Sequence, residues 1–167
     1  MLTIADAVEA LAGTRPATAT VITEAVIDSR HVIPGSLFVA IPGEKADGHD
    51  FIDEAFKRGA SFALTQKDAD ASFRTFDLRA ATPASVAAQE YSVPLCLRVE
   101  NTVTALQQIA RFWRRKLNLR VIGVTGSVGK STTKEMIAEV LATRFRTLKS
   151  PGNLNNEIGL PMTVLRL

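Results

Sequence analysis

The sequence predicts an α/β protein, in which a small N-terminal α/β domain is followed by the truncated start of a doubly wound parallel-sheet domain. Two observations support this fold class. Apolar runs of strand length alternate along the chain with segments whose apolar residues recur at helical spacing. Near residue 121 such a run leads into a glycine-rich loop and then into another helical pattern. The chain has 167 residues, of which 46% are hydrophobic and 22% charged, close to the average of globular proteins.

The first domain is assigned to residues 1–101. A capping-box-like pair, Thr3 and Asp6, predicts a helix that ends at Gly13. Asp50 is expected to cap a second helix, which ends near Gly59. Apolar runs predict four strands, at residues 25–27, 37–41, 61–65 and 95–99.

Three further features belong to this part of the chain. The turn pair Pro34 and Gly35 separates the first two strands. Residues 66–93 show only weak patterns, with alternation at 73–78 and an alanine-rich piece around Val86, so they receive no firm assignment. Cys96 lies within an apolar run and is interpreted as a small buried core residue.

The second domain is assigned to residues 102–167. Thr102 is expected to cap a long amphipathic helix that carries Trp113. Strands are predicted at 121–124 and 145–148, on either side of a helix, and Pro161 suits the first turn of a last helix. Because a doubly wound sheet needs several parallel strands, we expect the chain to be the N-terminal part of a longer protein.

The charge pattern raises the possibility of nucleic-acid binding, since the net charge is +3 and basic residues gather in one segment. Those residues are Arg111, Arg114, Arg115, Lys116 and Arg120. They alternate with apolar residues at helical spacing, so a solvated helix face is the favoured interpretation and no nucleic-acid partner is expected. With neither a membrane-length apolar run nor a secretory signal pattern, we expect a cytoplasmic protein without membrane insertion. The oligomeric state is not predicted.

The loop after the 121–124 run has the composition of a phosphate-binding loop, or P-loop. Its glycines, Gly126 and Gly129, allow backbone N–H groups to approach phosphate oxygens, and the following helix directs its positive end at the same anions. Lys130 is expected to reach the β- and γ-phosphates of ATP, and Ser131 to bind Mg²⁺. The expected ATP-binding set is Gly126, Ser127, Val128, Gly129, Lys130, Ser131 and Thr132. A plain glycine turn would leave the Lys-Ser-Thr run unexplained.

Other candidate binding residues follow predicted strands or precede helices. Ser29 and Arg30 come directly after a strand, and a guanidinium can grip a phosphate, although a locally bonded turn with Asp28 is the alternative. Asn155 and Asn156 carry amides that both donate and accept, although such residues also satisfy turns.

Three stretches together resemble the Mur ligases, which are ATP-dependent amide-forming enzymes of peptidoglycan precursor synthesis. The first extends from Asp28-Ser29-Arg30 through Asp47-Gly48-His49 to Gly59-Ala60 and is similar to the UDP-binding N-terminal domain. The second is the loop at 125–135, and the third is Asn153-Leu154-Asn155-Asn156-Glu157-Ile158-Gly159-Leu160-Pro161. The last two resemble the members that join D-alanyl-D-alanine to UDP-N-acetylmuramoyl-tripeptide.

The resemblance implies ATP, Mg²⁺ and both of those substrates as partners. It implies that Lys130 is catalytic and Ser131 a metal ligand. It also implies substrate contacts by Ser29, Arg30, Asp47, Gly48, His49, Asn155 and Asn156, while the remaining catalytic residues lie beyond residue 167. Isolated, this stretch is therefore expected to be inactive. Two alternatives stay open: the relative that adds the third peptide residue, and a non-catalytic module that binds UDP-muramoyl peptide or ATP.

Overall fold

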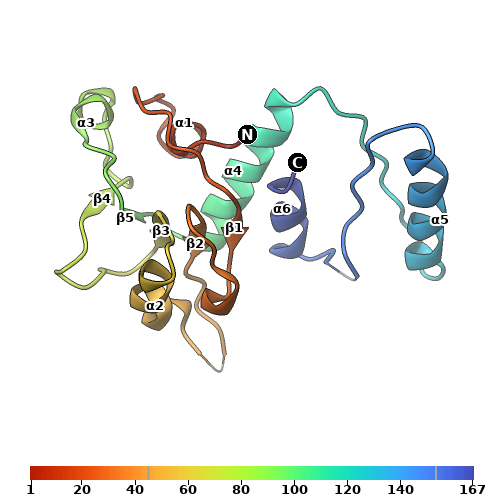
Figure 1. Cartoon of the computed structure of the whole chain (residues 1–167), viewed down its shortest axis with the longest axis horizontal. Coiled ribbons are helices and arrows are strands. Elements are labelled where there is room, and N and C mark those ends of the chain that lie inside the picture. Colours follow the sequence, from red (N-terminus) through yellow and green to blue (C-terminus); the bar gives the residue numbers. More distant parts are fainter. Residues whose placement is uncertain (45, 153) are drawn as a thin grey trace.

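The computed structural model describes residues 1–44, 46–152 and 154–167. A five-stranded sheet with helices on both faces forms the first part of the chain, and helices joined by long loops form the rest (Figure 1). The helices are α1 (Ile4–Ala12), α2 (Ile52–Lys57), α3 (Pro83–Ala88), α4 (Thr102–Lys116), α5 (Lys130–Ala142) and α6 (Gly159–Val164), with the 3-10 turns η1 (Ser29–His31) and η2 (Gly48–Phe51). The strands are β1 (Ala25–Val26), β2 (Leu37–Val39), β3 (Phe62–Thr65), β4 (Thr75–Asp77) and β5 (Leu95–Arg98).

The sheet has the strand order β1-β2-β3-β5-β4, and every neighbouring pair is parallel. The α/β fold class and the four expected strands are confirmed, with β4 supplying the fifth strand from the unassigned region. Since all strands run the same way, their carboxyl ends meet at one edge of the sheet. The loops that follow β1, β2 and β3 therefore lie on the same side of the domain.

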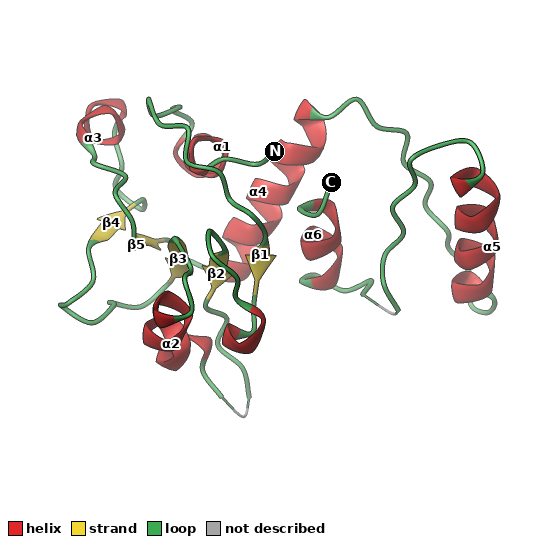
Figure 2. Cartoon of the chain, viewed as in Figure 1, coloured by secondary structure: helices red, strands yellow, loops and turns green. Residues whose placement is uncertain are grey.

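Both faces of the sheet are buried at β2, β3 and β5, which explains why these three strands consist mostly of apolar residues. Successive residues of β2 point to opposite faces, so Leu37 and Val39 join one hydrophobic cluster and Phe38 joins the other. Helices α1 and α4 cover the first face and α2 covers the second (Figure 2). Cys96 is fully buried among the second cluster, as expected.

Two predicted helix caps are wrong, although the helices exist. Asp50 does not cap α2, because η2 precedes that helix and the Asp47 side chain caps η2 by accepting from the N–H of His49. Thr102 is the first residue of α4, whose cap is the side chain of Asn101. The capping box of Thr3 and Asp6 on α1 is confirmed.

The two strands expected on either side of α5 do not form. Residues 118–128 and 146–150 are without regular structure, and Val121, Ile122, Phe145 and Leu148 are each more than 40% exposed. A strand exists only when a neighbour satisfies its N–H and C=O groups, and no such pairing joins these two segments within the described residues. Helix α5 accordingly stands apart from the sheet at the end of the molecule (Figure 1).

Helix α4 connects the two parts of the chain. It packs against α1 on one side and α6 on the other, and the N–H of its buried Trp113 donates to the carbonyl of Leu167 at 3.3 Å. Arg111, Arg114 and Arg115 lie on its exposed side, as the amphipathic pattern predicted. The division at residues 101 and 102 stays a prediction, but α4, which follows it, contributes to the core of the first part.

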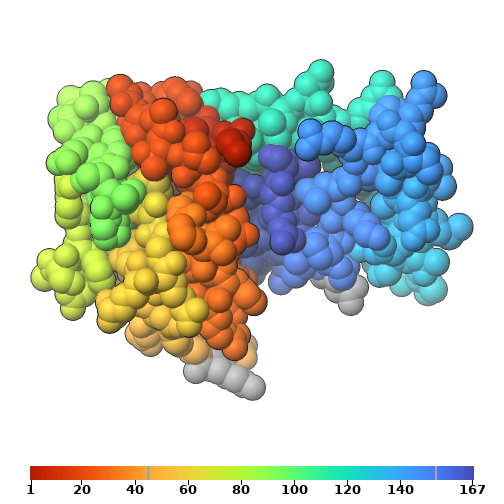
Figure 3. All heavy atoms as spheres, viewed as in Figure 1, coloured from red at the N-terminus to blue at the C-terminus, as the bar shows by residue number. Residues whose placement is uncertain are grey.

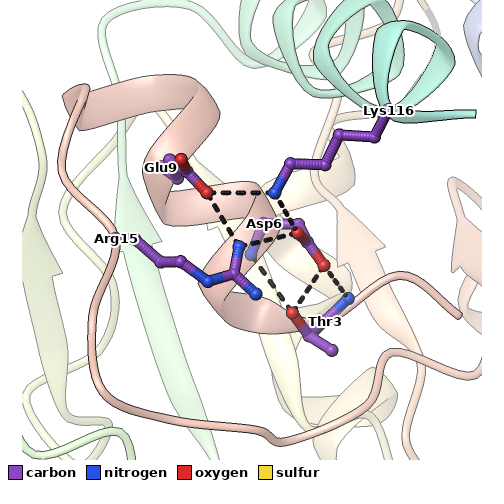
Figure 4. A network of polar contacts seen from close by, with 5 residues as sticks. All are labelled: Thr3, Asp6, Glu9, Arg15 and Lys116. Atoms are coloured by element: carbon purple, nitrogen blue, oxygen red, sulfur yellow. Dashed lines mark hydrogen bonds and ion pairs between the residues drawn. The ribbon is translucent and has the colours of Figure 1, made fainter.

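An ion-pair network holds α1 against the C-terminal end of α4 (Figure 4). The Asp6 carboxylate accepts from Arg15 Nη1 at 2.8 Å and from Lys116 Nζ at 2.9 Å, and Glu9 accepts from the same two cations.

Among the helices that the structure describes, none combines the length and apolar character needed to cross a bilayer.

Candidate functional site

The predicted P-loop leads directly into α5. Gly126 and Gly129 have φ angles of 142° and 81°, in the region that L residues with a side chain rarely adopt. Gly129 is the N-cap of α5, and its backbone places the first N–H groups of the helix beside the loop. Glycine at these two positions is what allows the loop to turn sharply onto a helix N-terminus.

The polar side chains of this loop are exposed and available to a ligand. Lys130 is the first residue of α5, and its ammonium folds back to donate to the carbonyl of Gly126 at 2.6 Å. Ser131 and Thr132 are exposed, and within the described parts of the chain their hydroxyls enter no hydrogen bond. The loop therefore presents one cation, free hydroxyls and unpaired N–H groups at one place, an arrangement suited to a polyphosphate.

Ser29 and Arg30 follow β1 at the carboxyl edge of the sheet, as expected. Ser29 is buried and its hydroxyl donates to Glu54 Oε2 at 2.9 Å. Arg30 is turned outward, and its guanidinium binds both oxygens of Asp28, with Nη2 to Oδ2 at 2.6 Å. This guanidinium keeps the pKa of the Asp28 carboxyl well below its usual range. The local turn that was the alternative interpretation is thus present, and the exposed guanidinium has donors left over.

Asp47, Gly48 and His49 lie after β2 and form a tightly bonded loop. The side chain of His49 is only 8% exposed, its Nδ1 bonds Asp47, and its Nε2 accepts from the N–H of Gln66 at 3.1 Å. Because Nε2 accepts, Nδ1 carries the proton and donates to Asp47. Lys67 also bonds Asp47, and with the N–H of His49 it holds the pKa of that carboxyl well below its usual range.

Gly48 has no room for a side chain, since an added Cβ would lie 2.6 Å from the amide nitrogen of Ile41. Both ring nitrogens of His49 are used inside the protein. These internal contacts hold the loop in place beside the strand ends.

Asn155 and Asn156 precede α6. The Oδ1 of Asn156 accepts from the N–H of Gly159 at 2.7 Å, and thereby satisfies a donor in the first turn of α6. Asn155 is exposed. Asn153, which begins the third family-like stretch, lies outside the described residues.

A cavity of about 610 Å³ lies between the β1 edge of the sheet and α6. Of the predicted substrate-binding residues Asn156 lines it, whereas Ser29, Arg30 and the loop of residues 47–49 do not. Asp28 and His31 line it from the first part of the chain, and Asn156, Thr163 and Arg166 line it from the second. Figure 3 shows the surface along which these two parts meet. A second cavity of about 480 Å³ between α4 and α6 is lined by both Asn155 and Asn156. Residues 126–132 line neither of these two cavities.

Sequence reasoning missed the residues that hold the predicted ones in place. Glu54 accepts a hydrogen bond from Ser29. The loop of residues 47–49 is supported by Gln66 and Lys67. In addition, His31 lines the larger of the two cavities. Gln66 and Lys67 could have been found, because they directly follow a strand whose carboxyl end shares an edge with β2. Glu54 is far from Ser29 in sequence, and only the packing of α2 brings them together.

Comparisons with known proteins identify the family. A model described as "Mur ligase family, catalytic domain" matches residues 21–114, and "Mur ligase middle domain" matches residues 124–167. Among curated proteins, the UDP-N-acetylmuramoyl-tripeptide–D-alanyl-D-alanine ligase of Bacillus subtilis is 41% identical over 148 residues, 89% of this chain and 28% of that enzyme. The enzyme of the same name from Escherichia coli is 39% identical over 84% of this chain and 26% of its own length.

Solved structures agree with this result. MurF from Acinetobacter baumannii has a TM-score of 0.73 and 32% identity, and the match covers 98% of this chain and 32% of that one. MurF ligase from Thermotoga maritima in complex with ADP has a TM-score of 0.66 and 34% identity, over 85% of this chain and 28% of the other. The chain thus spans under a third of the length of these relatives. Since one family model covers more than half of it, the chain belongs to the Mur ligase family.

Proposed function

We propose that this chain supplies the N-terminal part of an ATP-dependent ligase that joins D-alanyl-D-alanine to UDP-N-acetylmuramoyl-tripeptide. The observation that carries the proposal is the glycine loop with Lys130 at the start of α5, in a chain whose curated relatives have that name. In this reaction the terminal carboxylate of the peptide takes a phosphoryl group from ATP, and the amine of the dipeptide then displaces phosphate from the acyl phosphate. A cytoplasmic location is part of the proposal, because the reaction consumes ATP.

The nucleotide end of the site is the loop at 126–132. Phosphoryl transfer spreads negative charge over the oxygens of the γ-phosphate, so fixed N–H dipoles and a cation stabilise the transition state more than the ground state. Lys130 supplies that cation, and it must exchange the carbonyl of Gly126 for the phosphate. The two positive-φ glycines keep the backbone close enough for the N–H groups to participate. Ser127 and Val128 complete the loop, and Thr132 lies within the first helical turn.

Magnesium is the metal that this chemistry implies. Ser131 offers a hard hydroxyl oxygen on the first turn of α5, the kind of ligand that Mg²⁺ accepts, with phosphate oxygens and water completing its preferred set. The described residues contain no cluster of three or more His, Cys, Asp or Glu side chains that could hold a metal ion. When bound, the metal neutralises part of the phosphate charge.

The substrate end is proposed to lie between the two parts of the chain. Residues 1–101 would bind the UDP-muramoyl peptide and residues 102–167 would begin the ATP-binding domain. The cavity between β1 and α6 supports this arrangement, since both parts contribute to it. Arg30 and Asn156 are the proposed polar contacts, because the guanidinium of Arg30 is exposed and Asn156 lines the cavity wall. Ser29, Asp47, Gly48 and His49 are proposed to shape the site from the strand ends, and Asn155 to contact substrate from its exposed position.

The test uses the protein encoded by the complete reading frame that contains this chain. Phosphate release is measured with Mg²⁺-ATP, UDP-N-acetylmuramoyl-tripeptide and D-alanyl-D-alanine, and each substrate is omitted in turn. We expect release only when all three are present, and its loss in Lys130→Ala. Release that instead requires UDP-muramoyl dipeptide and a single amino acid would assign the earlier ligase step. Nucleotide binding without any turnover would reduce the protein to a binding module.

A further inference from the structure

We propose that Lys134 is a positioning residue that couples nucleotide binding at residues 126–131 to the segment carrying Asn155 and Asn156; this inference rests on the proposed function. Lys134 lies one helical turn beyond Lys130 on α5. Its Nζ donates to the carbonyl of Ser150 at 2.7 Å and to the carbonyl of Gly152 at 3.0 Å. An oxygen of Glu135 lies 3.3 Å from the same nitrogen.

The burial of Lys134 distinguishes it from the other lysine beside it. Its side chain is 19% exposed, whereas that of Lys149, which pairs with Glu135, is 45% exposed. A lysine normally keeps its ammonium in water and its stem mobile. Here the ammonium has exchanged water for two backbone carbonyls that lie 16 and 18 residues further along the chain. Such an arrangement fixes the backbone after α5 to α5 itself.

The fixed backbone continues into the asparagine segment through short-range contacts. The N–H of Leu154 donates to the carbonyl of Pro151 at 3.1 Å, and the N–H of Gly159 donates to Asn156 Oδ1 at 2.7 Å. Gly159 packs so closely that an added Cβ would lie 2.7 Å from the Cβ of Leu154. The residues from Leu154 to Gly159 are thereby joined to one another, and Lys134 ties the backbone just before them to α5.

The coupling follows from the rigidity of a helix. Phosphates that bind at the start of α5 act on its first turn, and the hydrogen bonds of the helix transmit any shift to Lys134 one turn later. Lys134 then carries the carbonyls of Ser150 and Gly152 with it. The nucleotide would thus determine where Asn155 and Asn156 stand relative to the transferring phosphate. This role is indirect, because Lys134 itself is bonded to backbone and has no part in the phosphate loop.

The test follows individual amides by NMR in the protein encoded by the complete reading frame that contains this chain, with and without Mg²⁺-ATP. In the wild-type chain, ATP is expected to perturb the amides of residues 126–131 and also those of Leu154 and Gly159. In Lys134→Met the perturbation should stop at the loop, and without nucleotide the Leu154 and Gly159 amides should exchange about tenfold faster, because two charge-assisted bonds are lost. Lys149→Met is the matched control and should behave as wild type. Lys134→Arg should restore part of the coupling.

Each outcome separates this inference from the proposed function. If Lys134→Met still transmits the effect of ATP to Leu154 and Gly159, or if wild type shows it only at the loop, the coupling role is wrong. If ATP leaves residues 126–131 themselves unperturbed in wild type, the proposed function fails and the inference fails with it. Unchanged amides in β3 and β5 of each variant would show that the sheet remains folded.

Discussion

Replacing Asp6 by alanine tests whether the network in Figure 4 holds the first part of the chain together. The Asp6 carboxylate accepts four hydrogen bonds, from Thr3 N at 2.9 Å, Thr3 Oγ1 at 2.6 Å, Arg15 Nη1 at 2.8 Å and Lys116 Nζ at 2.9 Å. Its side chain is only 6% exposed. Asp6→Ala removes half of a capping box and leaves two cations with Glu9 alone.

The magnitude follows from these contacts. Loss of a helix cap costs about 1 kcal/mol. Each charge-assisted bond is worth about 1.5 to 3 kcal/mol, and the lower value applies because Arg15 and Lys116 are partly exposed and keep Glu9 as a partner. We therefore expect the free energy of unfolding to fall by about 4 kcal/mol at pH 7.

The effect should depend on pH in a defined direction. Burial opposes ionisation of Asp6, but the bonds from Thr3, Arg15 and Lys116 outweigh it and hold the pKa of the carboxyl well below its usual range. A group whose pKa is depressed in the folded state stabilises it above the unfolded-state value, about 3.9, and that contribution is lost as pH falls further. The difference between wild type and Asp6→Ala should therefore be constant near pH 7 and shrink below about pH 4.

Urea unfolding followed by the fluorescence of Trp113 is the assay. Trp113 is the sole tryptophan and lies buried on α4, the helix that the network joins to α1. The matched control is Asp53→Ala, which breaks an exposed pair with Lys57 on α2 and should change stability little. If Asp6→Ala costs no more than Asp53→Ala, or if its effect ignores pH between 7 and 3, the network is a solvated surface feature and the reasoning is wrong.

Three other changes have outcomes that the structure specifies. Gly48→Ala should lower the thermal unfolding midpoint, because the added Cβ would lie 2.6 Å from the amide nitrogen of Ile41. The control Gly123→Ala should leave the midpoint unchanged, since its Cβ would have no atom within 4 Å. Equal midpoints of the two variants in a calorimetric scan would contradict this prediction. Burial raises the pKa of the Cys96 thiol to about 11, so at pH 8 an alkylating reagent should leave the folded chain unmodified and label it only in urea, and rapid labelling without urea would show that the sheet opens. Lys130→Ala should abolish heat from Mg²⁺-ATP in titration calorimetry while the unfolding midpoint stays unchanged, since among the described residues the side chain of this exposed lysine bonds only the carbonyl of Gly126. Retained ATP binding would refute its assignment.

The phosphate loop and the sheet illustrate what local sequence determines. Gly126 and Gly129 are needed at positive φ because of backbone sterics alone, and a lysine and hydroxyls after them predict the same chemistry in any surroundings. The apolar runs of β2, β3 and β5 likewise predict strands buried on both faces. Family membership also followed from linear motifs, because those motifs are continuous in the chain.

The wrong predictions of strands and helix caps share one physical cause. The structure of the residues concerned depends on hydrogen-bond partners that are distant in sequence. Residues 121–124 have the composition of a strand but lack a neighbour to bond, so they remain exposed. Asp50 does not cap α2, because η2 precedes that helix and is capped by Asp47. Asp47 is bonded by Lys67, and His49 by the N–H of Gln66, and both partners directly follow the next strand, β3.

The sequence by itself determined that this chain is an α/β protein with a glycine-rich loop that turns onto a helix, since those properties arise from local sterics and the period of apolar residues. Only the tertiary structure decided that the Arg30 guanidinium is already bonded to Asp28, that both nitrogens of His49 are occupied, and that α4 joins the two parts. A hydrogen-bonding group takes whichever partner the fold brings to it, and the linear pattern of residues does not contain that distance.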